Sequence, residues 1–159
     1  MQPAAYHKRF EIRWSDLDPN RHVANSAYSA FMSHVRMSFL HEQGFSQEKF
    51  AAYNLGPVIL KEEFHYLKEV MPAETVTIDL RQSGATADMR FVRWEHRLFN
   101  TSGLLAVFSR VIFCLIDLHK RKIATPPAEL QQIFKNLEKT PRFRLLTKSD
   151  LRNPELYAE

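Results

Sequence analysis

The chain opens with a short alternation of hydrophobic and polar residues. Phe10, Ile12 and Trp14 are separated by the charged residues Glu11 and Arg13, so their side chains share one face of an extended backbone. This pattern predicts a short strand with one apolar face. A polar loop that contains a proline follows the strand.

A helix is predicted after this loop, because apolar residues then recur at spacings of three and four. They are Tyr28, Phe31, Met32, Val35, Phe39 and Leu40. Asn25 or Ser26 can cap the start of the helix, and Gly44 is a natural terminator. Further apolar residues widen the stripe around much of the helix, so we expect other elements to surround it.

Extended segments are predicted after the helix. They cover residues 55–70, 75–81, 89–99 and 104–118. Residues 75–81 alternate between apolar and polar side chains, whereas residues 104–118 are almost continuously apolar. The valine, isoleucine and phenylalanine content of this last segment favours a central strand buried on both faces over a buried helix.

One strand, a long apolar helix and then four strands in antiparallel succession predict an α+β domain. The simplest way to bury the helix is to wrap the sheet around it, as in the hot-dog fold, with a five-stranded antiparallel sheet and one long central helix. A shorter helix over residues 128–137 ends the predicted domain, residues 1–139, and residues 140–159 are predicted to form a polar C-terminal tail. An open sheet edge predicts a homodimer, or a tetramer made of two dimers.

Composition and charge narrow the class of protein. The 159 residues are 45% hydrophobic, which fits one globular domain, and the longest apolar run is too short to span a bilayer as a helix. The N-terminus lacks the apolar core of a signal peptide, so a cytoplasmic protein is expected. The net charge of +4 includes no block of five or more like charges, which argues against a nucleic-acid partner. Cys114 is the only cysteine, so neither an intrachain disulfide nor a zinc site of the usual spacing is expected.

Chemically useful side chains concentrate between the predicted strand and the predicted helix. Asp16, Asp18, His22 and Asn25 fall within ten residues, beside a helix N-terminus. A loop carboxylate can attack a thioester or activate water, and free N–H groups at a helix start can bind the carbonyl oxygen. The two aspartates can instead simply cap turns in a proline-containing loop, and spacing alone does not separate these interpretations.

This segment resembles the signature of the 4-hydroxybenzoyl-CoA thioesterase branch of hot-dog proteins. Members read roughly Asp-x-Asp, a short turn, then His-Val-Asn-Asn and a tyrosine. The matching residues of this chain are Asp16, Asp18, His22, Val23, Asn25 and Tyr28, at the same spacing. Arg21 and Ala24 stand where the family usually has glycine and asparagine. The resemblance extends over about residues 6–137.

The resemblance implies a role for each matching residue. Asp18 is the catalytic carboxylate, as nucleophile or as general base, and the backbone N–H of Asn25 polarises the thioester carbonyl. His22, at the catalytic centre, and Asp16, beside the substrate, shape the loop. Tyr28 packs the helix against the sheet at the substrate's edge.

Other polar residues are weighed as substrate contacts. Glu63 and His65 lie on a predicted strand, where they either line the acyl pocket of a partner subunit or face solvent. Arg90, Arg93 and Arg97 are assigned to one face of the next strands, where they either meet cofactor phosphates or are solvated.

The resemblance and the loop chemistry predict hydrolysis of an acyl thioester of coenzyme A or of an acyl carrier protein. No metal or separate cofactor is expected, because coenzyme A is part of the substrate. Apolar side chains are expected to line the acyl pocket, namely Phe31, Val35, Phe39 and Phe64. An alternative is a non-catalytic module that binds acyl-CoA, which the residues at 21 and 24 support. A hydratase is disfavoured, because that branch pairs an aspartate and a histidine five apart, whereas Asp18 and His22 are four apart.

Overall fold

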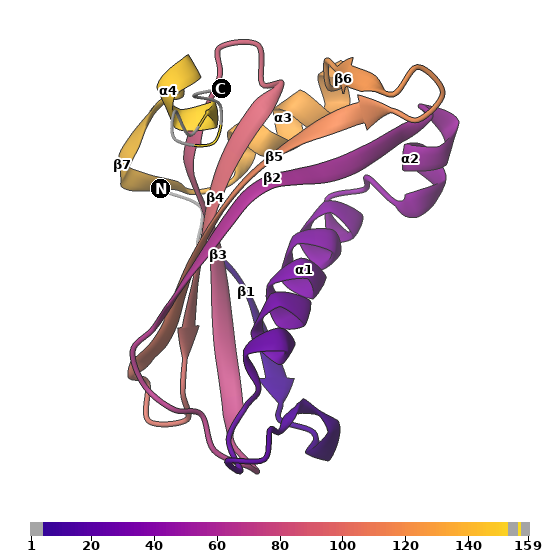
Figure 1. The fold of residues 1–159 in the computed structure, drawn as a ribbon. Coiled ribbons are helices and arrows are strands. Elements are labelled where there is room, and N and C mark those ends of the chain that lie inside the picture. Colours follow the sequence, from indigo (N-terminus) through magenta and orange to yellow (C-terminus); the bar gives the residue numbers. More distant parts are fainter. Residues whose placement is uncertain (1–4, 153–155, 157–159) are drawn as a thin grey trace.

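A computed structural model describes residues 5–152 and residue 156, and Figure 1 shows its fold. The elements follow in the order β1 (Tyr6–Glu11), η1 (Trp14–Asp16), α1 (Asn25–Glu42), α2 (Gln47–Ala52), β2 (Leu55–Tyr66), β3 (Thr75–Ala85), β4 (Phe91–Phe99), β5 (Leu105–Asp117), β6 (Lys122–Ala124), α3 (Ala128–Asn136), β7 (Lys139–Leu145) and α4 (Lys148–Leu151). The predicted order of strand, long helix and four strands is confirmed.

The sheet has a main path of five antiparallel strands in the order β1-β3-β4-β5-β2. Two short strands extend it, since β6 pairs with β5 and β7 pairs in parallel with β3. The apolar run predicted as a central strand is β5, which lies between β4 and β2 and is buried over most of its length. The predicted α+β hot-dog fold is therefore confirmed, and the five predicted strands form the main path of a sheet that has seven strands.

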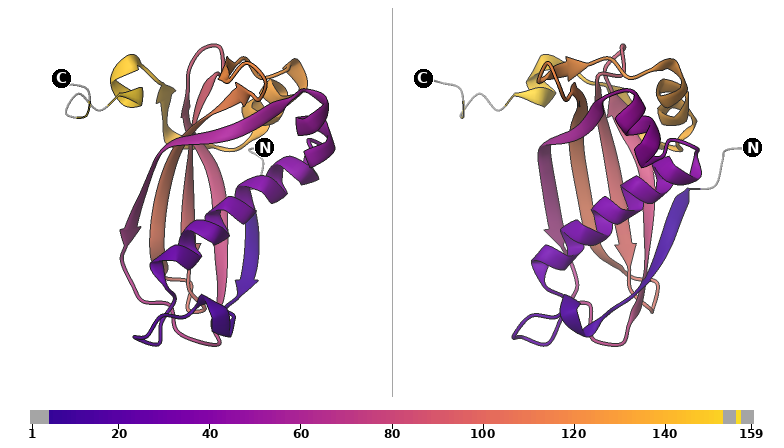
Figure 2. Two further views of the ribbon diagram at one scale, coloured as in Figure 1. Left: turned by 45° about the vertical axis from the view of Figure 1, so that its right-hand side comes forward. Right: turned by 90° about the vertical axis from the view of Figure 1, so that its right-hand side faces the viewer.

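Helix α1 is 18 residues long and crosses one face of the sheet, as both views in Figure 2 show. Its buried side chains recur at helical spacing and fill the space against that face. Ala24 occupies the N-cap position and makes no side-chain cap, so the prediction that Asn25 or Ser26 caps the helix is wrong. The helix does end as predicted, because Gly44 takes the left-handed conformation, with φ of 87°.

The two faces of the sheet have different chemistry. On β4, Trp94, His96 and Leu98 point to the face covered by α1, which we call the core face. Arg93 and Arg97 alternate with them on the opposite face, which we call the outer face. The same alternation continues on the neighbouring strands through their register. Only residues whose side chains point to the core face can therefore contact a ligand beneath α1.

Two segments differ from the predictions. Trp14 does not belong to the first strand, which ends at Glu11; it lies in η1 with 88% of its surface exposed. The segment predicted as a polar tail continues the domain instead, with β7 in the sheet and Leu146 buried over Gly84. A Cβ atom on Gly84 would lie 2.7 Å from the end of the Leu146 side chain and 3.0 Å from the backbone carbonyl oxygen of Arg144, so the adjoining segment would have to shift. Residues 153–155 and 157–159 of that segment lie outside the described residues.

Candidate active site

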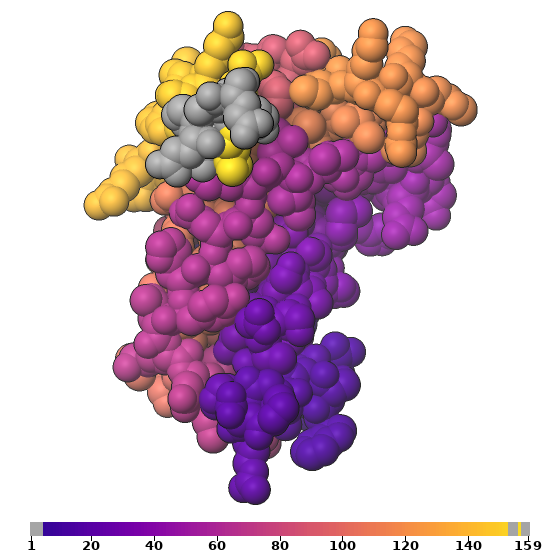
Figure 3. Space-filling view, viewed as in Figure 1, coloured from indigo at the N-terminus to yellow at the C-terminus, as the bar shows by residue number. Residues whose placement is uncertain are grey.

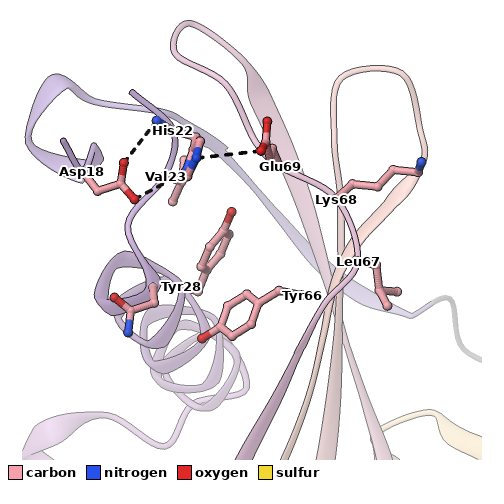
Figure 4. A pocket seen from close by; sticks show the side chains of 9 residues that line it. Asp18, His22, Val23, Tyr28, Tyr66, Leu67, Lys68 and Glu69 are labelled. Atoms are coloured by element: carbon pink, nitrogen blue, oxygen red, sulfur yellow. Dashed lines mark hydrogen bonds and ion pairs between the residues drawn. The ribbon is translucent and has the colours of Figure 1, made fainter. Parts of the chain in front are cut away.

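A pocket of about 350 Å³ lies at the N-terminal end of α1. Figure 4 shows it between the loop after η1, the first turn of the helix and the end of β2. The side chains that line it are Asp18, His22, Val23, Asn25, Tyr28, Tyr66, Leu67, Lys68 and Glu69. The loop and helix thus supply the polar residues that the sequence singled out, and the end of β2 supplies the opposite wall.

Hydrogen bonds within its own loop hold the Asp18 carboxylate in place. Its Oδ1 accepts from the backbone N–H of Asn20 at 2.8 Å and lies 3.4 Å from the N–H of His22, and its Oδ2 lies 3.4 Å from Nδ1 of His22. The backbone closes the loop in addition, since the Asp18 N–H donates to the His22 carbonyl at 2.9 Å. About a quarter of the Asp18 side chain stays exposed, so the carboxylate is oriented yet open to the pocket.

Asp16 does not line the pocket, but its hydrogen bonds hold the loop in shape. Its carboxylate is buried and accepts from the backbone N–H of Arg13 at 2.8 Å and from the Arg13 guanidinium at 3.0 Å. These bonds from Arg13 hold the pKa of Asp16 below its usual value against the opposing effect of burial. The Asp16 carbonyl also accepts from the Ala24 N–H at 2.8 Å, which fixes where α1 begins.

The start of α1 offers hydrogen-bond donors to the pocket. The first hydrogen bond of the helix runs from the Ala27 N–H to the Ala24 carbonyl. The N–H groups of Asn25 and Ser26 therefore have no acceptor within the helix. Such N–H groups, with the positive end of the helix dipole, favour an oxygen that carries negative charge. A carbonyl group placed over Asn25 would meet both these donors and the neighbouring Asp18.

Two tyrosines form the apolar floor of the pocket. Tyr28 on α1 and Tyr66 at the end of β2 pack with ring centroids 5.6 Å apart (Figure 4). Tyr28 is buried, and burial, together with nearby acidic groups, raises the pKa of its hydroxyl to about 12. The hydroxyl therefore stays protonated at neutral pH, and Tyr28 both packs the helix on the sheet and faces the pocket.

The far wall comes from residues that the sequence analysis did not single out. Leu67, Lys68 and Glu69 follow β2, more than forty residues after the loop that carries Asp18. Glu69 lies with its Oε1 3.9 Å from Nε2 of His22, so His22 stands between two carboxylates. Their only signal in the sequence is that they end a predicted strand, and no local motif links them to the loop.

Several predicted contacts do not meet at this pocket. Glu63 and His65 lie on the outer face, where Glu63 accepts from Arg110 at 3.2 Å and His65 is largely exposed. Arg90 precedes β4 and donates to the Ile123 carbonyl, so it does not share a face with the other two arginines. Those guanidinium groups are engaged on the outer face, Arg93 with Ser83 and Arg97 with Asp79.

The residues predicted to line the acyl pocket belong to the packed interior instead. Phe31, Val35 and Phe39 are almost completely buried against the sheet, and Phe64 packs against the same core. The helix stripe is the core of the domain, and the pocket opens at the end of that stripe. The prediction failed here because apolar periodicity indicates burial without separating core from ligand cavity.

Two further findings concern the described part of the chain. None of its helices combines the length and apolar character that crossing a bilayer requires. Within the same residues, no group of three or more histidine, cysteine or acidic side chains is arranged to hold a metal ion. The chemistry available at the pocket is two carboxylates, a histidine, a lysine, two tyrosine hydroxyls and backbone donors.

The fold and this pocket together define a hot-dog domain with a carboxylate at the start of its central helix. Residues 12–134 match the thioesterase-like superfamily, and the chain belongs to that superfamily. No curated protein matches the chain by sequence.

Solved structures share the fold at low sequence identity. A Staphylococcus aureus protein in complex with CoA superposes with a TM-score of 0.78 and 18% identity, covering 96% of both chains. A 1,4-dihydroxy-2-naphthoyl-CoA thioesterase from Synechocystis gives 0.76 and 14%, covering 84% of this chain and 98% of the other. The DHNA-CoA thioesterase from Staphylococcus aureus gives 0.74 and 14%, with coverage of 81% and 87%. At these identities the likeness establishes the fold.

Proposed function

We propose that this protein hydrolyses acyl thioesters of coenzyme A or of an acyl carrier protein. The observation that carries the proposal is the Asp18 carboxylate, held open to a pocket beside the free N–H groups at the start of α1. Membership of the thioesterase-like superfamily supports the reaction class. Similar structures that carry CoA, or are named as CoA thioesterases, support coenzyme A as the carrier.

The proposed mechanism assigns one task to each group. The thioester carbonyl oxygen accepts from the Asn25 N–H, which stabilises the negative charge that forms on it during attack. Asp18 either attacks the carbonyl carbon, which forms an anhydride that water then cleaves, or takes a proton from the attacking water. In both routes the carbon–sulfur bond breaks, and the departing thiolate takes up a proton that the water gives up. His22 holds the Asp18 carboxylate through its backbone N–H and its ring. Coenzyme A enters as part of the substrate, so the mechanism uses no separate cofactor.

The proposal includes assembly into a homodimer through β2. This strand is the edge of the main sheet path, and its end forms the wall of the pocket at Tyr66. A second copy paired along β2 would satisfy the open backbone groups and cover the exposed side of the pocket. Two such dimers can form a tetramer through the remaining surfaces.

The decisive experiment measures thiol release from acyl-CoA substrates of two to sixteen carbons. We expect Asp18→Asn to lower kcat by about 10³-fold with little change in Tm, because it removes the charge and keeps the shape of the side chain. Glu11→Gln is the matched control, since Glu11 is an exposed carboxylate on β1.

The outcomes separate the two functions. Loss of turnover in Asp18→Asn alone supports hydrolysis by Asp18. Turnover that survives this substitution contradicts the assigned catalytic residue. Saturable acyl-CoA binding by the wild-type protein without thiol release would identify a binding module instead.

A further inference from the structure

A second cavity lies further along α1, on the side of the helix that faces β2. Its volume is about 140 Å³ and its walls are mainly apolar, with Met37 and Leu40 from the helix and Ile59 from β2. A cavity of about 150 Å³ accommodates a benzene-sized group, so this one has room for roughly six carbon atoms. Its position separates it from the catalytic loop.

The wall of this cavity also carries a buried cation. Arg36 is 7% exposed, and its guanidinium donates to Oε1 of Glu62 and to Oγ of Ser33, both at 2.9 Å. A guanidinium has five N–H donors, and these two bonds use two of them. Glu62 neutralises the charge, so the cavity presents hydrogen-bond donors without a net positive charge.

The cavity and the catalytic pocket both lie between α1 and β2. Tyr28 packs on Tyr66 at the pocket, and Arg36 on the cavity wall pairs with Glu62. Arg36 follows Asn25 by eleven positions, which corresponds to ~16 Å along a helix. An extended chain of about twelve carbons covers this distance at the usual bond lengths.

We propose that this cavity binds the distal end of a medium-length acyl group and that Arg36 recognises a hydroxyl group there. The inference rests on the proposed thioesterase function and names its substrate class. A hydroxyl oxygen accepts from Arg36, and its proton can be donated to Oγ of Ser33, which also lines the cavity. A carboxylate is disfavoured, because Glu62 already neutralises Arg36.

The first test compares matched substrates. We expect kcat/KM for 12-hydroxydodecanoyl-CoA to exceed that for dodecanoyl-CoA by about tenfold, a ratio in the range that one added hydrogen bond supplies. Butanoyl-CoA is too short to reach the cavity, so adding a terminal hydroxyl to it should have no such effect.

The second test replaces the buried pair. Arg36→Met combined with Glu62→Leu removes both charges together, since removing one alone would leave the other buried and unpaired. We expect the preference for the hydroxylated substrate to disappear, so that the ratio of the two kcat/KM values falls to about one. Arg81→Met with Glu138→Leu removes another arginine–glutamate pair, 3.5 Å apart and away from this cavity, and should keep the preference.

A binding measurement keeps the inference testable if no thioester is cleaved. Met37 lines the cavity, so its ¹³C-labelled methyl group should shift when 12-hydroxydodecanoic acid binds, and more weakly with dodecanoic acid. Equal affinity for the two acids, or no shift at Met37, would overturn the cavity assignment. Binding with this preference but without thiol release would uphold the cavity and reject the proposed hydrolysis.

Discussion

Arg21 has a strained backbone conformation in the loop that carries Asp18. Its φ of 66° lies in the left-handed region, where a side chain clashes with the backbone. The loop needs this conformation, because the Arg21 N–H donates to the Asp18 carbonyl at 3.0 Å and the next residue turns back to bond the Asp18 carboxylate. Asp18 is therefore oriented by a turn that glycine would form with less strain.

Replacing Arg21 with glycine should stabilise the protein. Relief of the left-handed strain is worth about 1–2 kcal/mol and the added freedom of the unfolded chain costs about 0.4–1 kcal/mol, which leaves a net gain of about 0–1.6 kcal/mol. Urea unfolding of Arg21→Gly measures this gain, and Arg21→Ala, which keeps the strain, should show none. An equal effect of the two substitutions would point to the lost charge instead.

Sequence predicts the pocket wall formed by the loop and the start of α1 far better than the wall formed by the end of β2. Asp18, His22 and Asn25 lie within one loop and helix start, where local spacing fixes their relative positions. Glu69 reaches His22 only because β2 returns along α1, and such long-range contacts leave no mark on local spacing. The same limit explains Glu63, which periodicity places on a strand without saying which face meets a ligand.

Elements were predicted wherever their apolar pattern is strong. β5 and α1 are recognisable because burial on one or both faces requires continuous or periodic apolar residues. β7 has the sequence KTPRFRL, mostly exposed and charged, so its backbone pairing with β3 has no hydrophobic signature. Trp14 fits the alternation of apolar and polar residues in the first strand by chance, but it lies in η1, where its side chain is exposed.

Strand β4 contains a group that should make stability depend on pH. His96 is 0% exposed on the core face, with Nδ1 3.2 Å from Oγ of Ser109. Burial, and secondarily the charge of Arg36, lowers the pKa of His96 well below its usual value. The folded protein therefore keeps this side chain neutral at a pH where the unfolded chain takes up a proton.

The free energy of unfolding should fall as the pH drops below the unfolded-state pKa of His96. The contribution is fully present above about pH 6.5 and is lost by up to about 1.4 kcal/mol per pH unit below it. Urea unfolding between pH 7.5 and 5.5 measures this slope, which His96→Gln should reduce. His119→Gln, at an exposed turn, is the control, and a slope unchanged by His96→Gln would refute the assignment.

At the scale of the whole molecule, the sheet is unequally protected at its two edges. β1 is short, with six residues, and lies beyond β3. β2 has twelve residues and ends the main path, with Ile59 and Leu60 nearly half exposed at a bulge in its pairing with β5. Figure 3 shows the molecular surface from the same direction as Figure 1. A long edge strand with exposed apolar side chains is the expected place for a second copy.

The purified protein should therefore have a mass of at least twice the chain's 18.7 kDa in light scattering. Leu60→Lys should shift it toward monomer, because charge on an edge strand opposes pairing with another edge. Leu145→Lys is the matched control, since Leu145 is exposed on β7.

If β2 also closes the pocket, the Leu60→Lys monomer should show a raised KM for acyl-CoA, because Tyr66 lies on the same strand. A wild-type monomer with full thiol-releasing activity would contradict the β2 dimer, whereas a Leu60→Lys dimer with normal KM would place the subunit contact elsewhere.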